Sequence, residues 1–257
     1  MRKYAAGSHV SSVREHIEDM ERLDLEIGSL DALLHVEFAD YGVSGLIFDY
    51  GGTIDTRGEH WSDVILRGYK AAGIEMPYET FWNAYVAAER ELGRHPHILP
   101  SDNFYDVLRK KVAIETGAIE LSTLSAEQCG RLVAESDKYV EKIASWCYDE
   151  ARRCVAEATP VLEALAARFP MVMVSNFYGN LNAVLDDFGI REYFRDVIES
   201  AVVGIRKPDP EIFRLGIEAL GLPAGCIATI GDSYEKDILP ASTLGTHTVR
   251  VTGKGDR

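Results

Sequence analysis

Apolar and polar positions follow two different patterns along the chain. The run GLIF at residues 45–48 is uninterrupted by polar side chains and ends at an acid and a glycine pair, which is typical of a strand buried on both faces. Between residues 58 and 157, apolar side chains instead recur three and four positions apart, in the segments 63–74, 79–93, 102–117 and 125–154. We therefore expect one buried strand followed by a long helical insert without a convincing strand.

After Pro160 the two patterns alternate. Helical spacing is found at 161–169, 180–190 and 211–221, and short apolar runs lie at 171–175, 196–203, 226–231 and 246–251. This alternation predicts an α/β fold, a Rossmann-like doubly wound parallel sheet with helices on both faces, together with an all-helical cap domain. The expected division is an N-terminal extension (1–44), the core (45–57 plus 158–257) and the cap (58–157). Within the extension we expect one or two helices before LLHVEF at 33–38.

Composition and charge narrow the classes of partner. The chain is 46% hydrophobic and 26% charged, an ordinary globular composition, and its 41 acids against 27 Lys and Arg give a net charge of −14. Nucleic acid and anionic membrane are disfavoured because both require a basic surface. No apolar run is long enough for a transmembrane span, and the N-terminus is too polar for a signal peptide. The four cysteines show no CxxC spacing, so we expect buried thiols in a cytoplasmic protein.

Polar side chains follow several of the predicted strands at the point where each strand ends. Asp49 follows 45–48, Ser175 ends the run at 171–175 and Asn176 comes next, and Asp232 follows 226–231. Lys207 comes shortly after 196–203. In open parallel sheets ligands bind beyond the carboxyl ends of the strands, so these residues are expected to meet there.

Four stretches resemble, in order and spacing, the motifs of the haloacid dehalogenase-like hydrolase superfamily: Asp49-Tyr50-Gly51-Gly52-Thr53, Ser175, Lys207-Pro208, and Gly231-Asp232-Ser233 through Asp237. The resemblance covers residues 45–57 and 158–251, and the insert resembles the superfamily's helical cap. It implies a Mg²⁺-dependent phosphatase-like hydrolase acting on a small phosphorylated metabolite. Residues 1–44 lie outside the resemblance, and a protein contact through them is an open possibility without support.

The roles implied for the matching residues are those of phosphoryl transfer. Asp49 would be the nucleophile that forms an aspartyl-phosphate, and Lys207 would neutralise the nucleophile and the phosphoryl oxygens together. Thr53 and Ser175 would donate hydroxyl hydrogen bonds to phosphate.

The implied metal and substrate contacts use oxygen ligands and backbone amides. Carboxylates and carbonyl oxygens suit Mg²⁺. The expected ligands are Asp49, Asp232 and the Gly51 carbonyl, with Asp237 as a support or water-mediated ligand. The expected substrate contacts are free N–H groups at Gly52 and Asn176, together with His60.

Gly51 is the departure from the pattern. Phosphatases of this superfamily usually carry Asp-x-Asp at the first motif, and the second Asp serves as general acid and base. Three interpretations stay open. Another acid replaces it, with Asp55, Glu59 and His60 the nearest candidates; or the substrate has a good leaving group such as an acyl phosphate; or the chain is a catalytically weak phosphometabolite-binding or regulatory protein.

Two other reaction types of the superfamily have less support in the sequence. The dehalogenase branch is disfavoured because Asp232 and Asp237 are both kept, and a phosphonatase-like Schiff base on Lys70 has no supporting pattern. His95-Pro96-His97 suggests metal binding, but no third ligand is evident in the sequence, so we expect an exposed turn of the cap there.

Overall fold

Six parallel strands form one sheet in the computed structural model, which describes residues 22–253. In chain order they are β1 (Asp24–Ile27), β2 (Gly45–Phe48), β3 (Met171–Ser175), β4 (Asp196–Glu199), β5 (Ile227–Gly231) and β6 (His247–Val251). Their order across the sheet is β1-β6-β5-β2-β3-β4, with every neighbouring pair parallel. From β2 the chain moves first to β3 and β4 on one side, then to β5 and β6 on the other. This is a doubly wound topology and confirms the Rossmann-like α/β core.

Helices cover both faces of the sheet. On one face, Ile47 of β2 and Val172 of β3 pack in one cluster with Ile212 and Phe213 of α9 (Glu211–Leu220) and with the short α10 (Leu239–Thr243). The alternate residues of the same strands belong to the larger core cluster, which includes buried residues of α6 (Ser136–Ala166) and α7 (Leu181–Asp187). Because both faces are covered, every residue of β2, β3 and β5 is buried, as their continuous apolar runs predict.

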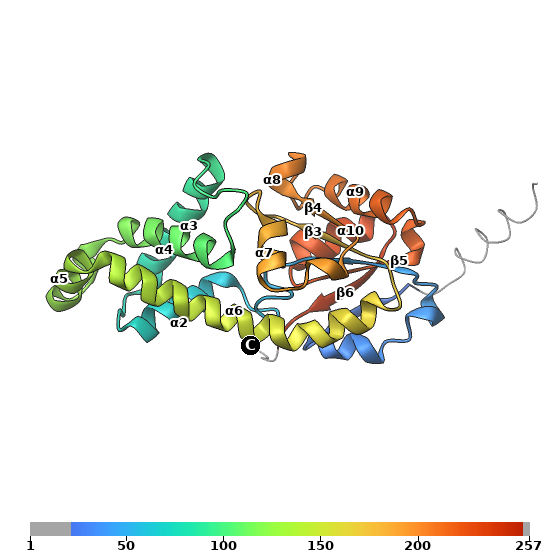
Figure 1. Ribbon diagram of the computed structural model, residues 1–257, viewed down its shortest axis with the longest axis horizontal. Helices are drawn as coiled ribbons and strands as arrows, with labels where there is room; N and C mark the ends of the chain where they lie inside the picture. Colours follow the sequence, from blue (N-terminus) through green and yellow to red (C-terminus); the bar gives the residue numbers. More distant parts are fainter. Residues whose placement is uncertain (1–21, 254–257) are drawn as a thin grey trace, which may run out of the picture.

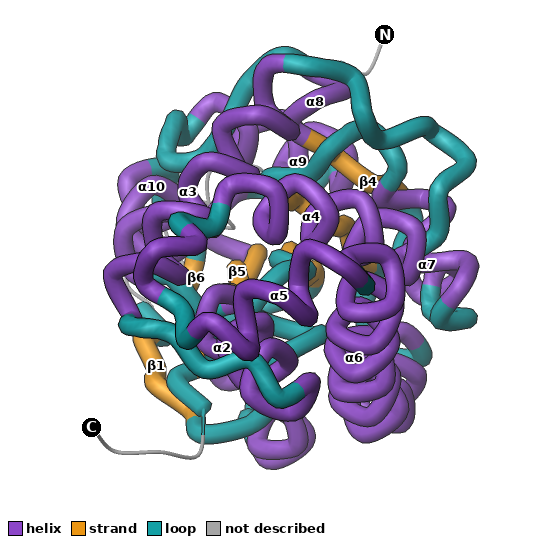
Figure 2. The backbone as a smooth tube through the Cα atoms, turned by 90° about the vertical axis from the view of Figure 1, so that its left-hand side faces the viewer, coloured by secondary structure: helices purple, strands orange, loops and turns teal. Residues whose placement is uncertain are grey.

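The connection from β2 to β3 is helical. It consists of α2 (Trp61–Ala72), α3 (Tyr78–Arg94), α4 (Phe104–Ala118), α5 (Ala126–Ala134) and α6. Capping boxes at Asn103/Asp106 and Ser125/Gln128 define where α4 and α5 begin. In Figure 1, α2 to α5 project to the left of the sheet, and Figure 2, seen from that side, shows them in front of the strands. None of the described helices combines the length and apolar composition needed to cross a membrane.

Helix α6 runs without interruption through the expected cap–core boundary at 157/158. Pro160 lies inside it, at the cost of one backbone hydrogen bond and a local clash, about 3 kcal/mol in an isolated helix. Buried residues on both sides of the proline, among them Val155, Ala158, Val161 and Leu162, hold the helix together. The division into core and cap stays a prediction, and one helix spans the boundary proposed for it.

Two local expectations were wrong. Residues 24–27, where we expected helix, form β1, which pairs with β6. The sequence did not indicate this strand, because a four-residue alternation of charged and aliphatic side chains is too short to be distinguished from a helix. Residues 196–203 form a strand only to Glu199, and α8 (Ser200–Val203) follows. The side chain of Glu199, the last residue of the strand, accepts N–H bonds from residues 179–181 at the start of α7. Residues 1–21 of the expected extension lie outside the described part of the chain.

Candidate active site

The carboxyl ends of β2, β3 and β5 bring the predicted polar side chains together. Asp49 follows β2, Ser175 ends β3, and Asp232 follows β5. Together with Lys207 and Asp237 they line one cavity of about 580 Å³, whose opposite wall comes from α2, α3 and α4. The expected convergence at this edge of the sheet is therefore observed.

Asp49 is the centre of the hydrogen-bond network. Its Oδ1 accepts from Lys207 Nζ at 2.7 Å and from Ser175 Oγ at 3.0 Å, and its Oδ2 accepts from Thr53 Oγ1 at 3.1 Å. The Asp49 backbone N–H donates to Ile230 O at 2.9 Å, which fixes the residue to β5. Oδ1 thus faces the Lys207 ammonium, whereas Oδ2 lies on the side of Asp232.

Lys207 bridges two buried carboxylates. Its Nζ donates to Asp49 Oδ1 and, at 2.6 Å, to Asp237 Oδ1, and its side chain is only 2% exposed. Burial opposes the charge, but Asp237 and Asp49 outweigh it and raise the pKa of Lys207 above its ordinary value. The ammonium is therefore a fixed positive charge beside Asp49.

Three carboxylates lie close enough to share a cation. Ligand atoms of Asp49, Asp232 and Asp237 all lie within 4.8 Å of one another. Thr53 Oγ1 is 3.1 Å from both Asp49 Oδ2 and Asp232 Oδ1, yet its single proton can be donated to only one of them. Burial, followed by the charges of Asp49 and Asp237, raises the pKa of Asp232 to about 7. A hard divalent cation between these oxygens fits the donor set and would relieve their repulsion.

Asp237 and Asn176 both support Lys207. Both Asp237 oxygens are engaged, Oδ1 by Lys207 and Oδ2 by the Ser233 N–H at 3.0 Å, which fits the expected supporting role. Asn176 accepts the Lys207 N–H on Oδ1 (2.9 Å) and donates from Nδ2 to Lys207 O (3.1 Å). The Asn176 side chain thus positions the lysine, a function that the expectation of a backbone phosphate contact did not include.

The expectation of a free N–H at Gly52 was wrong. This N–H donates to Asp55 Oδ1 at 2.7 Å. Gly52 has φ +94°, and a Cβ here would lie 2.6 Å from the Asp232 carboxyl. Glycine is required so that the backbone can pass Asp232 closely, and the amide holds Asp55 instead of phosphate.

Gly51 differs from its neighbour. A Cβ built on it has no heavy atom within 4 Å, apart from adjoining residues. No close approach or positive φ demands glycine at this position. Glycine at this position therefore removes the carboxyl group, although the surroundings leave open space for a side chain.

The three candidate acids have different surroundings. Asp55 is 1% exposed and accepts from Gly52 N and from Trp61 Nε1 (2.9 Å), and burial raises its pKa to about 8. Glu59 forms a bidentate pair with Arg67 on the surface. Of the three only His60 lines the cavity with Asp49.

His60 forms the N-cap of α2, where its Nδ1 accepts the Ser62 N–H at 3.2 Å. In that arrangement the proton of a neutral ring is on Nε2. Burial, then Lys236 and Lys111, lowers the pKa of His60, so the neutral form is favoured.

The wall opposite Asp49 holds a half-buried ion pair that no sequence pattern indicated. Lys111 of α4 contacts Glu89 of α3, and its Nζ lies 4.3 Å from the centre of the Tyr85 ring. Tyr178, in the loop after β3, donates to Glu89 at 3.2 Å. These side chains, with Arg206, line the cavity. A lysine and a glutamate 22 positions apart on separate helices carry no common signal in a single sequence.

The chain matches a known protein family over most of its length. The model of the haloacid dehalogenase-like hydrolases matches residues 43–245, and the chain belongs to this family. It is 37% identical over 83 residues to the haloacid dehalogenase-like hydrolase domain-containing protein 3 of Bos taurus, covering 32% of this chain and 33% of that protein. This chain thus spans about a third of the length of such relatives.

A longer match links the chain to a phosphatase. The 5-amino-6-(5-phospho-D-ribitylamino)uracil phosphatase YigB of Escherichia coli is 29% identical over 203 residues, which cover 76% of this chain and 78% of that protein. Among solved structures, a crystal structure of a dehalogenase covers 84% of this chain and 87% of its own, with a TM-score of 0.53 at 16% identity. That likeness concerns the fold alone.

Proposed function

We propose that this chain is a Mg²⁺-dependent phosphatase-like hydrolase that forms an aspartyl-phosphate on Asp49. The observation that carries the proposal is the pair of donors on Asp49 Oδ1, Lys207 Nζ at 2.7 Å and Ser175 Oγ at 3.0 Å. A carboxylate oxygen surrounded by a fixed ammonium and a hydroxyl is placed to meet a phosphoryl group. The phosphatase name of the Escherichia coli relative supports the same chemistry.

The reaction would proceed in two displacements. Asp49 Oδ1 attacks phosphorus, the bond from phosphorus to the leaving oxygen breaks, and that oxygen takes up a proton. Water then attacks the aspartyl-phosphate, which releases phosphate and restores the carboxylate. Lys207 and Ser175 already contact Oδ1, so they would stabilise the negative charge that develops on the phosphoryl oxygens next to it.

The metal would be held on the other side of the nucleophile. Asp49 Oδ2 and Asp232 Oδ1 converge beside Thr53, and with the Gly51 carbonyl they provide the hard oxygen ligands that Mg²⁺ requires. Bound there, the ion would offset the repulsion between these carboxylates and a phosphate dianion. Asp237 supports the site through Lys207.

The substrate would be a small phosphorylated metabolite. The cavity of about 580 Å³ suits a small molecule, and the side chains facing Asp49 combine the Lys111–Glu89 pair with aromatic rings. We propose that α2 to α5 act as the cap that covers the site, excludes water and selects the non-phosphate part of the substrate.

His60 is the proposed contact to the leaving oxygen. A neutral ring with its proton on Nε2 can donate a hydrogen bond there, although it transfers a proton less readily than a carboxylic acid. A substrate with a good leaving group, such as an acyl phosphate, would need little more. A hydrogen bond from His60 together with a good leaving group would compensate for the lack of an acid at position 51.

A second candidate function follows from the same position. Loss of a general acid and base costs typically about 10²- to 10⁴-fold in rate, and the open space at Gly51 shows that the backbone does not demand this loss. A phosphometabolite-binding or regulatory protein would retain the phosphate site and do without fast turnover.

Phosphate release from an aryl phosphate and an acyl phosphate, with and without Mg²⁺, separates these functions. The enzyme is expected to turn over at least one of them only with Mg²⁺, and Asp49→Asn is expected to abolish turnover. Equal rates for the wild type and Asp49→Asn would exclude Asp49 as nucleophile. A wild type inert on both substrates that still binds phosphate would favour the binding protein.

A further inference from the structure

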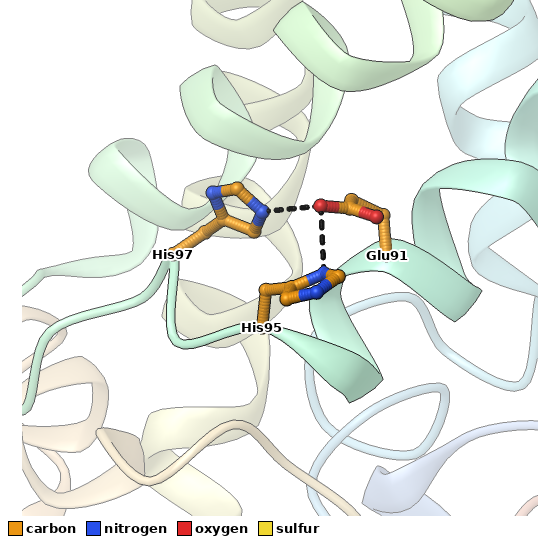
Figure 3. A group of neighbouring side chains, drawn as sticks. All are labelled: Glu91, His95 and His97. Carbon is orange, nitrogen blue, oxygen red and sulfur yellow. Dashed lines mark hydrogen bonds and ion pairs between the residues drawn. The ribbon is translucent and has the colours of Figure 1, made fainter.

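Three potential metal ligands converge at the end of α3, outside the catalytic cavity. His95 Nδ1 lies 2.9 Å and His97 Nε2 lies 2.8 Å from the same oxygen of Glu91, Oε1 (Figure 3). All three ligand atoms lie within 4.8 Å of one another. The third ligand that the sequence did not reveal is Glu91, one helical turn before His95.

The backbone arranges this convergence. Glu91 and His95 lie four residues apart at the end of α3, and the His95 N–H donates to Glu91 O at 3.0 Å. The His97 N–H donates to His95 O at 2.9 Å, which closes a three-residue turn with Pro96 at its centre. The proline ring holds φ near the value that such a turn needs, so the turn that carries both imidazoles is rigid.

The donor types differ from those at the catalytic site. Asp49, Asp232 and Asp237 offer oxygen only, which suits Mg²⁺, whereas two imidazole nitrogens with one carboxylate oxygen suit Zn²⁺ and neighbouring transition metals. We propose that Glu91, His95 and His97 form a Zn²⁺ site, with water completing the coordination. Bonds from the metal to the two nitrogens and to the oxygen would replace the present hydrogen bonds to Glu91.

The site is open to solution. The three side chains are 40% to 59% exposed, so an ion can enter without any opening of the fold. Metal binding requires the ligating nitrogens to be free of protons, and zinc affinity should therefore fall in acid.

The proposed site would fix the link between two walls of the catalytic cavity. Residues 95–103 join α3 to α4, and Ile98 packs with Leu92 and Val107 from these helices. The same link touches the loop after β3, where Asn180 Nδ2 donates to Asp102 O at 2.8 Å. A bound ion would stabilise this connection, and a metal that binds only the folded state raises the midpoint of thermal unfolding.

Isothermal titration of Zn²⁺ into the full chain tests the proposal. The protein is first stripped with a chelator and then held in excess Mg²⁺, so that the carboxylate site is occupied. We expect one Zn²⁺ per chain. Even outer partners of metal ligands cost about 10- to 100-fold in affinity when removed, so His95→Ala and His97→Ala should weaken binding by at least that factor. Glu91→Gln should weaken it, and His35→Ala, an exposed histidine elsewhere, should not.

Thermal unfolding gives a second readout. Zn²⁺ should raise the midpoint for wild type and His35→Ala, and should leave that of His97→Ala unchanged. All three ligands are surface residues, so the variants should give the wild-type circular dichroism spectrum without zinc. The proposal is overturned if His95→Ala and His97→Ala retain wild-type zinc affinity, or if the wild type binds no zinc in excess Mg²⁺.

Discussion

Lys207 Nζ lies 2.7 Å from Asp49 Oδ1, although 158 positions separate the two residues in the chain. The contact is buried, and Asp237 shares the ammonium. Removing one partner of a buried ion pair leaves the other partners without compensation. We therefore expect the lysine to affect both catalysis and stability.

Lys207→Met is expected to lower kcat by about 10²- to 10³-fold, because a fixed charge at the reacting oxygens is lost. It should also lower the free energy of unfolding by about 3–5 kcal/mol, since two buried carboxylates would face each other. Phosphate release and urea unfolding measure the two effects. Lys70→Met, at an exposed position of α2, is the control and should change neither. Full activity in Lys207→Met would contradict the assigned role.

Gly51→Asp should raise the rate with a simple alkyl phosphate by about 10²- to 10⁴-fold, because the space beside Gly51 admits a carboxyl that can act as general acid and base. Gly51→Asn is the matched control, since it has nearly the same size without the acid. Steady-state kinetics on both variants provides the measurement. A gain by the asparagine variant equal to that of the aspartate would show that size, rather than proton transfer, was limiting.

His60→Ala should reduce kcat for an alkyl phosphate by about 10²-fold, and much less for an acyl phosphate, whose leaving group needs little help. The contrast between the two substrates is the diagnostic measurement. His35→Ala serves as the histidine control because His35 is exposed and is not among the residues that line the cavity. If both substrates lost rate equally, His60 would be a structural N-cap of α2 with no contact to the leaving oxygen.

Lys111→Met should raise KM more than it lowers kcat, because Lys111 lines the cavity without contacting the nucleophile. The matched control is Lys110→Met, whose lysine pairs with Asp102 and is not among the cavity residues. Initial-rate kinetics with the best substrate of a phosphate-ester panel distinguishes the two. A kcat loss without a change in KM would contradict a role in substrate recognition.

Glu115 of α4 gives a pH prediction for stability. It is fully buried, and burial raises its pKa to about 8. The folded state then holds a proton that the unfolded state releases above about pH 4.5, so stability should fall as pH rises from 4.5 to 8. Glu115→Gln should remove this loss and be more stable than wild type at pH 8, by up to a few kcal/mol.

Urea unfolding at pH 5 and pH 8 measures this effect. Glu75→Gln, at an exposed position, should follow the wild-type pH dependence. The same dependence in Glu115→Gln would show that the carboxyl is ionised in the folded protein. Lys111, four residues earlier on the same helix, is the group that would then stabilise the charge.

Strong local patterns allowed most of the fold to be predicted. The apolar runs before Asp49, Ser175 and Asp232 became β2, β3 and β5 because strands buried on both faces are apolar throughout. Their order placed the polar residues that follow them at one edge. The features that were missed involve distant partners: β1 pairs with β6, and Glu199 at the end of β4 caps a different helix.

The sequence predicted which polar residues gather at the site, but it did not predict all of their hydrogen-bond partners. Lys207 and Ser175 both contact Asp49, at the edge of the sheet where the three residues were expected to meet. Gly52 was assigned to phosphate, but its N–H is held by Asp55. Asp55 lies three residues after Gly52, the spacing at which the acid of a capping box accepts a backbone N–H, so this spacing could have indicated the contact. The pairing of Lys111 with Glu89 was hidden because the two residues lie on separate helices, 22 positions apart.

Strand β1 also determines what happens when the beginning of the chain is removed. It pairs along its whole length with β6, and both Ile27 at its end and Leu23 just before it are buried. Without residues 22–44, β6 would present a row of unpaired backbone N–H and C=O groups together with newly exposed apolar side chains. Such an edge accepts a strand from any neighbouring molecule. A shortened protein would therefore self-associate, and its loss of activity would reflect aggregation rather than a missing catalytic group.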